Sequence, residues 1–315
     1  MRRRLTRLVA ACLTLGLLPQ AAAQTGDEQG FFLAAGITRL PSADAGGITG
    51  SGAATLEGRE HQLYAGGLRF GVAAMRFELG VDYQYTRYVY EDIDSRNRDL
   101  HRLQIPLHFE SAVGDWRLHG HLAPGVSTSS NVFKDLFKRG SADDVVVSAG
   151  VEGRLDTGKR TWIAGVAHDR SFGRPALYPV IGVEVEPASM TRLRLAFPDS
   201  SLSIEWSDRL GFSARVFPAG HRWHVVADDF ASEFDYRVEA IRAQASLGVV
   251  LWRALRADLS LGYEFDREHA LTDDLGVRLN APLDDQWFVA LGFRTGGAKL
   301  PLTHGAHLPG GRSGF

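Results

Sequence analysis

The sequence predicts an all-β fold, an antiparallel transmembrane β-barrel of about 12 to 14 strands with one short helix in a loop. Apolar and polar residues alternate along most of the chain, and no apolar run after residue 18 is long enough to form a membrane helix. The tryptophans also lie near the ends of the alternating segments. The alternation is clearest in RADLSLGYEFDRE, whose apolar wall comprises Ala257, Leu259, Leu261, Tyr263 and Phe265. Because a soluble β-sandwich shows the same period, the alternation alone does not identify the neighbour of this wall.

The first 23 residues have the features of a secretory signal peptide. Four arginines precede or border an apolar stretch from Leu8 to Leu18, and small residues lead to an expected cleavage after Ala23. The one cysteine, Cys12, lies in this segment, so the exported chain has no disulfide. Removing four arginines and no acidic residue moves the formal net charge from −2 to −6. With no basic run in the exported chain, we expect no nucleic acid partner.

The remaining chain is predicted to have three parts. Residues 24–60 are rich in Gly and Ala, show no sustained period, and are expected to form a flexible leader. Residues 61–293 alternate almost throughout and are expected to form the barrel. Residues 294–315 form a tail that contains Gly, Pro and His.

Counting the alternating segments gives about fifteen strands, from Gln62–Phe70 to Gln286–Phe293. Single-chain bacterial barrels have an even number of strands, so this count contains an error. Between Gly182 and Asp228 every connection is short and the strands are the shortest of the chain. Either a strand in that region is miscounted or two segments merge through a bulge, which leaves about twelve or fourteen strands.

The positions of the aromatic residues favour a barrel over a sandwich. Amphipathic rings are most stable at the boundary between lipid headgroups and hydrocarbon, whereas large aromatic residues of a sandwich core tend to lie in the middle of strands. All six tryptophans lie within about three residues of a predicted strand end, at Trp116, Trp162, Trp206, Trp223, Trp252 and Trp287.

The run AFPDSSLSIEWSDRLGFSARVFPAGHRWHV and the strands around it, from about Glu60 to Phe293, resemble the outer-membrane β-barrel proteins of Gram-negative bacteria. Among these, the run is similar to an uncharacterised barrel family of unassigned function. The segment WFVALGF, which ends at Phe293, fits the aromatic-ended pattern that the barrel-insertion machinery reads in such proteins. The resemblance implies a location in the bacterial outer membrane. It also implies contact with outer-membrane lipids, lipopolysaccharide and the insertion machinery.

Aligning the apolar walls of a hairpin predicts which polar residues face each other on its other wall. In the hairpin of residues 236–266, placing Leu251 opposite Leu255 sets Arg242 opposite Glu264. Arg102 is expected on the polar wall of RLQIPLHFE. These charged residues are candidates for lining the lumen. The pair of Arg242 and Glu264 is either a structural ion pair or part of a charge filter that selects solutes.

A second hairpin brings three histidines to one polar wall. If it has a four-residue turn at AVGD, His108 lies opposite His119, and Glu110 lies opposite Arg117, with His121 on the same wall. Neighbouring imidazoles can bind Zn²⁺ or another borderline metal, and Glu110 could orient one of them. The alternative, which we favour, is a solvated lumen wall, so we predict no metal and no cofactor.

The stretch SSNVFKDLFKRG, in the longest internal loop, predicts the short helix. Ser130 can cap it, Val132 and Phe133 begin an apolar face, and Gly140 can end it. Such a helix can pack on the barrel rim, fold into the pore as a constriction, or lie on the outer leaflet.

An enzymatic role is disfavoured by the sequence. Pairs of adjacent acids, such as Asp143-Asp144 and Asp228-Asp229, occur at turns and strand ends, where capping residues are common. Neither His119 nor His224 has an obvious serine partner, and no GxSxG motif is present. We therefore expect no catalytic residues. The leading hypothesis is a passive or semi-selective pore for small solutes, and the alternatives are a structural or surface-binding barrel with a blocked lumen or an outer-membrane hydrolase.

Overall fold

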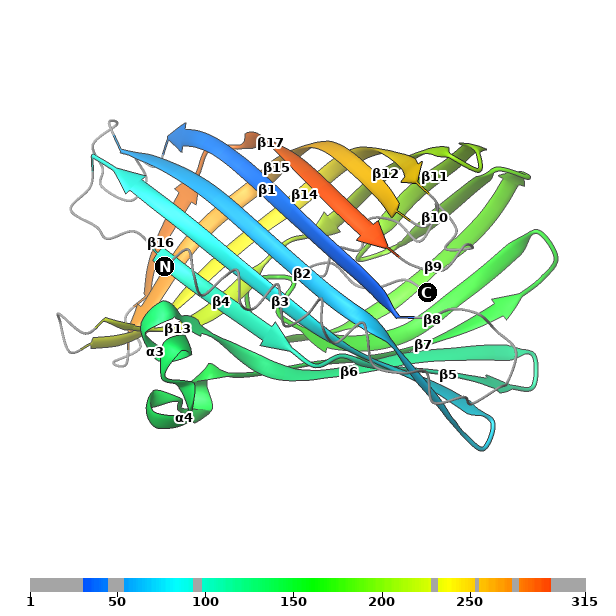
Figure 1. Cartoon of the computed structure of the whole chain (residues 1–315), viewed down its shortest axis with the longest axis horizontal. Helices are drawn as coiled ribbons and strands as arrows, with labels where there is room; N and C mark the ends of the chain where they lie inside the picture. The colour runs from blue at the N-terminus through cyan, green and yellow to red at the C-terminus, as the bar shows by residue number, and fades with distance from the viewer. Residues whose placement is uncertain are drawn as a thin grey trace.

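The structure, a computed structural model, describes residues 31–44, 54–92, 98–227, 232–252, 255–273 and 278–295. Seventeen strand segments form one closed sheet and combine into an antiparallel barrel of fourteen strands, as predicted (Figure 1). The segments are β1 (Phe32–Asp44), β2 (Thr55–Val72), β3 (Met75–Glu91), β4 (Arg98–Gln104), β5 (Leu107–Val113), β6 (Trp116–Ser129), β7 (Val145–Asp156), β8 (Arg160–Asp169), β9 (Ala176–Ala188), β10 (Thr191–Phe197), β11 (Ser200–Ser207), β12 (Leu210–Pro218), β13 (His221–Ala227), β14 (Ser232–Trp252), β15 (Leu255–Asp273), β16 (Arg278–Leu283) and β17 (Gln286–Thr295).

Three of the fourteen strands are interrupted, which accounts for the seventeen segments. β4 and β5 lie between β3 and β6 and are separated by Ile105 and Pro106. β12 and β13 pair with β14 in one register, and β16 and β17 both pair with β15. Of the two options for residues 182–228, a miscounted strand or two segments merged through a bulge, the structure has β12 and β13 as one strand that keeps its register along β14 without a bulge. The last two predicted segments, counted as two strands, are also one strand, formed by β16 and β17.

β1 closes the barrel, because it pairs with β2 along one edge and with β17 along the other. The predicted flexible leader at 24–60 is therefore wrong at Phe32–Asp44, which form β1, and from Thr55, where β2 begins. Many of the residues in the first half of β1 are Ala or Gly, so its two walls differ little in hydrophobicity. The hydrogen bonds between strands do not require a difference in hydrophobicity between the two walls. A search for alternating apolar and polar residues therefore does not detect this strand.

Two other predicted parts fall largely outside the described residues. The signal peptide at 1–23 lies outside them, as does the tail at 294–315 except for Arg294 and Thr295, which end β17. In the part of the chain that is described, none of the helices is both long and apolar enough to span a membrane.

The connections at the two ends of the barrel differ in length. At one end, turns of two or three residues join β2 to β3, β5 to β6, β7 to β8 and the later pairs. At the other end the connections are mostly longer, and one of them contains helical turns. Since outer-membrane barrels have short periplasmic turns and longer extracellular loops, we assign the second end to the cell exterior.

The outer face carries a band of exposed apolar side chains. On β17, the outward residues Trp287, Val289, Leu291 and Phe293 alternate with buried positions. Five of the six tryptophans are exposed in this way, which agrees with the predicted girdles. Trp223 is the exception. It lies near a strand end but is only 1% exposed and faces the interior, so its assignment to a girdle is wrong.

The loop between β6 and β7 contains short helical turns rather than the single predicted helix. These are α3 (Ser130–Lys134), α4 (Leu136–Arg139) and the 3-10 turn η1 (Ala142–Asp144). Asp135, with φ −124°, separates α3 from α4. Ser130 does not cap α3, because its hydroxyl lies 2.6 Å from Nε2 of His101. Val132 is fully buried where α3 packs on β4, β6 and β13, so the helical segment lies on the barrel rim.

The role of β1 can be tested by deletion. Removing residues 32–44 should prevent closure, because β2 and β17 would each lose their partner. The variant should then lack the compact, SDS-resistant band that a folded barrel gives without boiling, whereas deletion of residues 24–30 should leave that band in place. A compact band of normal mobility in the 32–44 deletion would show that β1 is dispensable for closure.

Candidate functional site

β14 reverses its hydrophobic pattern midway along its length. The outward residues change from Glu233, Asp235, Arg237 and Glu239 to Ile241, Ala243, Ala245, Leu247 and Val249, while the inward residues change from Phe234, Tyr236, Val238 and Ala240 to Arg242, Gln244 and Ser246. Near this change, Tyr263 of β15 pairs with Ala243 and contacts Trp287, with ring centroids 4.9 Å apart. An apolar outer wall suits lipid and a charged one suits water, so β14 leaves the hydrocarbon near Ile241 and projects beyond the membrane.

An apolar core fills the interior of the projecting part. Its buried residues come from β2, β3, β4, β13, β14 and β16, and we call them the outer plug: Leu56, Tyr88, Leu100, Trp223, Val225, Tyr236, Val238 and Leu283. Tyr88 meets Trp223 edge to face, with ring centroids 6.5 Å apart. The outer plug therefore fills the interior of this projecting part with side chains of its own wall.

The hydroxyl group of Tyr236, inside the outer plug, has two polar partners. The hydroxyl of Tyr236 lies 2.6 Å from the hydroxyl of Tyr90 and 2.6 Å from Nδ1 of His269. A buried hydroxyl without a partner would be costly, so this chain of three groups allows tyrosine to contribute to an otherwise apolar core.

A layer of four buried charges lies directly beneath the outer plug. The predicted register of this hairpin is confirmed, because Arg242 pairs with Glu264, and their side chains meet at 2.5 Å. Arg242 also donates two hydrogen bonds to Glu60 of β2, at 3.0 and 2.6 Å. Arg267 contacts the other oxygen of Glu264 at 3.2 Å, and the Arg242 guanidinium lies 5.1 Å from the ring centre of Phe288.

This charged layer connects strands that are not neighbours in the sheet. β2 and β14 are separated by β1, β17 and β15, so the contact between Glu60 and Arg242 crosses the barrel interior. Two guanidinium groups balance two carboxylates, which leaves the layer without net charge. This neutrality bears on the two interpretations of the predicted pair of Arg242 and Glu264. A neutral layer fits a structural ion pair. It offers no excess charge with which a charge filter could select a solute.

Arg102 lies in a second polar group under the outer plug. Its guanidinium is 3.5 Å from Oδ2 of Asp82 on β3 and 3.4 Å from Nδ1 of His221 at the start of β13. Asp82 and His221 are both buried. Arg102 therefore connects the wall formed by β3 and β4 to β13 through the interior.

The hairpin of β5 and β6 carries the predicted histidines in a different register. A two-residue turn, in which Gly114 has φ +60°, pairs His108 with His121 and Glu110 with His119. The predicted four-residue turn is therefore wrong by two residues, because glycine adopts the left-handed conformation that a tighter turn needs. The shift is an even number, so the three histidines still share one wall, and the rings of His108 and His121 lie 6.3 Å apart.

The same shift moves Arg117 away from Glu110. Arg117 lies opposite Ala112 and forms an exposed ion pair with Asp156 at 2.5 Å, near the periplasmic end. Within the described ranges, no group of three or more His, Cys, Asp or Glu side chains is arranged to hold a metal ion.

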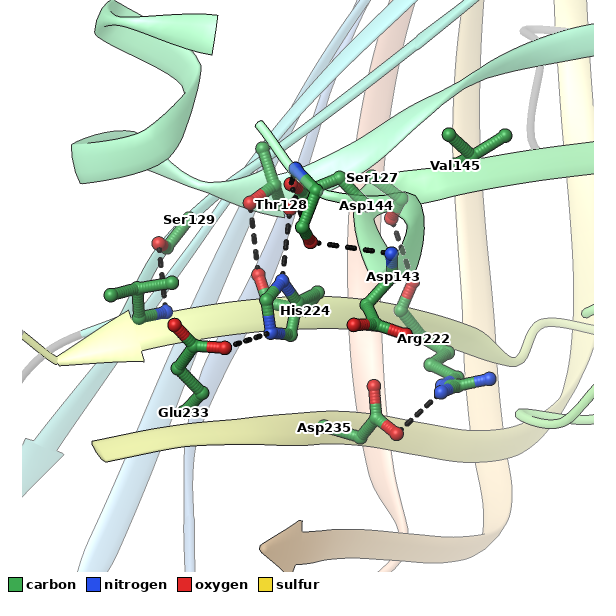
Figure 2. A network of polar contacts seen from close by, with 12 residues as sticks. Ser127, Thr128, Ser129, Asp143, Asp144, Val145, Arg222, His224, Glu233 and Asp235 are labelled. Atoms are coloured by element: carbon green, nitrogen blue, oxygen red, sulfur yellow. Dashed lines mark hydrogen bonds and ion pairs between the residues drawn. The ribbon is translucent and has the colours of Figure 1, made fainter. Parts of the chain in front are cut away.

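A seam of polar contacts joins β6 to β13 beside the outer plug (Figure 2). β7 pairs with β6 only up to Val126, and beyond this point the free edge of β6 lies against β13, in parallel at Thr128 and His224. Three consecutive hydroxyls supply the contacts: Ser127 donates to the Arg222 carbonyl at 2.6 Å, Thr128 donates to the His224 carbonyl at 3.0 Å, and Ser129 accepts from the Val226 amide at 3.4 Å.

His224 braces this seam between two carboxylates. Its Nδ1 lies 3.1 Å from Asp144, and its Nε2 lies 3.6 Å from Glu233 of β14 (Figure 2). Asp144 is buried and accepts a hydrogen bond from the backbone amide of Ser141 at 2.7 Å. Since both ring nitrogens face carboxylates, the arrangement is a brace between β13, η1 and β14 rather than a base beside a nucleophile.

Several of these residues escape prediction from the sequence. Glu60 falls at the end of the predicted leader, and Trp223 is assigned to a girdle because it lies near a strand end. Ser127 and Thr128 occupy a stretch that reads as an ordinary loop. The reversal of the hydrophobic pattern along β14 is a signal in the sequence that points to the outer plug. Before Ile241 the charged residues of β14 point outward and its apolar residues point inward, and after Ile241 the two sides exchange.

Comparison with known proteins gives similarity in fold. No family model matches the chain, and no curated protein matches it. Among solved structures, it is similar to an outer membrane channel from Pseudomonas putida F1, at 9% identity over 89% of this chain and 99% of that one, with a TM-score of 0.47. It is also similar to the translocator domain of the autotransporter NalP from Neisseria meningitidis (10% identity, 93% and 95% coverage, TM-score 0.38) and to the Pseudomonas putida toluene transporter TodX (12%, 90% and 91%, 0.31).

The closed fourteen-stranded sheet with its outward apolar band decides the class of the protein. The chain folds as a transmembrane β-barrel. In this barrel, the membrane-spanning part has a polar interior and the extracellular part has an apolar one.

The charged layer can be tested by removing its central cation. Arg242→Met leaves Glu60 buried without its partner and leaves Glu264 with Arg267 alone, which should cost about 3 to 5 kcal/mol of stability. The compact band should then disappear at a lower temperature than in the native barrel. Combining Arg242→Met with Glu60→Gln should recover part of the loss, because Glu264 keeps Arg267 as its partner and no uncompensated charge remains in the layer.

Arg117→Met is the matched control, because it removes an arginine from an exposed ion pair. It should leave the transition temperature nearly unchanged. Equal losses in the Arg242 and Arg117 variants would contradict the assignment of a structural role to the buried layer.

Proposed function

We propose that this barrel is a non-enzymatic channel for small polar solutes, held closed at its extracellular end. The observation that carries the proposal is the change of the interior from polar to apolar at the outer membrane boundary, where the outer plug begins. Fourteen strands enclose more space than side chains alone fill, so a polar lumen of this size is expected to hold water. A water-filled lumen that side chains of its own wall close at one end is what we expect of a channel in its closed state.

The lining of the lumen supports passage of polar solutes without strong charge selection. Arg154 and Arg194 both contact Glu152, at 2.7 and 3.3 Å, and Arg256 contacts Asp258 at 2.9 Å. Arg294 also contacts Asp258 at 3.3 Å, and Arg192 contacts Glu184 at 3.3 Å and Glu186 at 3.0 Å, so these contacts join five arginines to four carboxylates. Such a nearly balanced lining favours hydrated solutes over apolar ones, and it provides no strong field of a single sign that would select for anions or cations.

We assign the gate to β13. One edge of β13 forms a continuous ladder with β14, whereas the other edge is held to β6 by the seam. The seam consists mostly of side-chain to backbone hydrogen bonds and is the weaker of the two edges. Separation of β13 from β6 would carry Trp223 and Val225 out of the interior and open the outer plug.

The contacts around His224 and His101 support a non-enzymatic role. The hydroxyl of Ser130 lies 2.6 Å from Nε2 of His101, but Nδ1 of that ring faces the hydroxyl of Tyr83 at 2.8 Å rather than a carboxylate. Hydrolysis by a serine nucleophile requires a hydroxyl within hydrogen-bond reach of a histidine nitrogen. At His224 the printed partners of the two nitrogens are Asp144 and Glu233, while the hydroxyls of Ser127 and Thr128 donate to backbone carbonyls.

A surface-binding barrel with a permanently blocked lumen is the second candidate function. The observation that favours it is the completeness of the outer plug, in which Leu100, Trp223 and Tyr236 are at most 1% exposed. The two candidates differ in whether the outer plug ever opens.

Conductance across planar bilayers separates the candidates. The native barrel should be closed for most of the recording, with brief conductance steps. Trp223→Ala combined with Leu100→Ala should give large, persistent steps, because it empties the centre of the outer plug. Trp287→Ala removes an outward tryptophan and should behave like the native barrel.

Each variant should first be checked for the compact band, since loss of a buried Trp costs about 3 to 5 kcal/mol. Silence of a folded double variant would overturn the channel and favour the surface-binding barrel. Persistent conductance in the native protein would instead contradict closure by the outer plug.

A further inference from the structure

Three arginines lie side by side on the outer surface of β1, β2 and β3. Arg39 pairs in register with Arg59, and Arg59 pairs in register with Arg87. Side chains in such positions lie about 5 Å apart, and like charges directly opposite each other are destabilising. All three side chains are exposed, by 66%, 50% and 46%. We call this set the arginine row.

Nearby acids neutralise the arginine row only in part. Glu57 contacts Arg39 at 3.4 Å and Arg59 at 3.0 Å. Asp99 is 3.8 Å from Arg87 and accepts a hydrogen bond from the hydroxyl of Tyr85 at 2.5 Å. Among the described residues, two carboxylates thus face three guanidinium groups. The excess positive charge and the number of guanidinium N–H groups suit an anion with several oxygens.

The position of the arginine row places it at the level of lipid headgroups. The next outward positions toward the membrane centre are Ile37, His61 and Tyr85, and one step further Leu63 pairs with Tyr83. Tyrosines are enriched at the boundary between hydrocarbon and headgroups, so the arginines lie just outside that boundary. This end of the barrel faces the cell exterior, where the outer leaflet carries lipopolysaccharide.

We propose that the arginine row is a binding site for a phosphate group of lipopolysaccharide. Neighbouring guanidinium groups can share one phosphate through charge-assisted, bidentate hydrogen bonds, a geometry that lysine does not provide. Phosphate binding also explains why three like charges are kept in register. The site lies on the outside of the barrel and is independent of whether the lumen conducts.

Binding can be measured with purified lipopolysaccharide added to the detergent-solubilised barrel. The triple variant Arg39→Gln, Arg59→Gln, Arg87→Gln should fold and give the compact band, but should bind lipopolysaccharide about tenfold more weakly or worse. Arg69→Gln is the matched control, because Arg69 is an exposed arginine on the same strand, paired with Glu78 near the periplasmic end. It should bind as the native protein does.

The arginine row should stabilise the barrel only when lipopolysaccharide is present, and a stability measurement without lipid tests this. In detergent alone, Arg59→Gln should keep or raise the temperature at which the compact band is lost, because it relieves repulsion on both sides. Added lipopolysaccharide should then stabilise the native barrel more than this variant. Unchanged affinity in the triple variant would overturn the proposal. Equal stabilisation of the native barrel by dephosphorylated lipopolysaccharide, by phosphatidylglycerol vesicles or by inorganic phosphate would overturn it as well.

Discussion

The closed backbone ladder is the constraint on which the rest of this structure depends. Hydrocarbon offers no water to pair with a backbone N–H or C=O group, so a sheet that crosses a membrane cannot have an open edge. The pairing of β1 with both β2 and β17 removes that edge. The ladder makes no demand on side chains, which is why β1 can consist largely of small residues.

Closure of fourteen strands creates an interior that side chains cannot fill everywhere. Within the membrane this interior is polar, because the outer wall must be apolar and the strands alternate. Beyond the membrane the outer wall is charged and faces water, so the same alternation turns apolar residues inward and they pack as the outer plug. One change of environment, at about the level of Ile241, thus explains both the polar lumen and its closed end.

The seam between β6 and β13 follows from differences in strand length. β10 and β11 have seven and eight residues, whereas β14 and β15 have 21 and 19. The wall is therefore lower at β10 and β11, and the projecting β13 has no neighbour there. It meets the free end of β6 instead, and this meeting narrows the extracellular part enough for side chains to fill it.

The sequence predicts the parts of this account that depend on local alternation. The barrel and the pairing of Arg242 with Glu264 follow from a period of two, whereas the fourteen-strand option also needs the rule that such barrels have an even number of strands. The turn at Gly114 was predicted two residues too long, because alternation is unchanged by an even shift. The contact of Arg242 with Glu60 and the burial of Trp223 depend on which strands meet across the interior, and a local period contains no information about that.

The environment of Trp223 tests the account most directly. In a variant that retains only this tryptophan, with the other five replaced by Phe, fluorescence in liposomes can be quenched by iodide from water or by brominated lipid from the bilayer. A dry core beyond the membrane predicts blue-shifted emission that neither agent quenches, whereas a variant that retains only Trp287 should be quenched by the brominated lipid. Strong quenching of Trp223 by iodide would show an open, hydrated mouth and would contradict the outer plug.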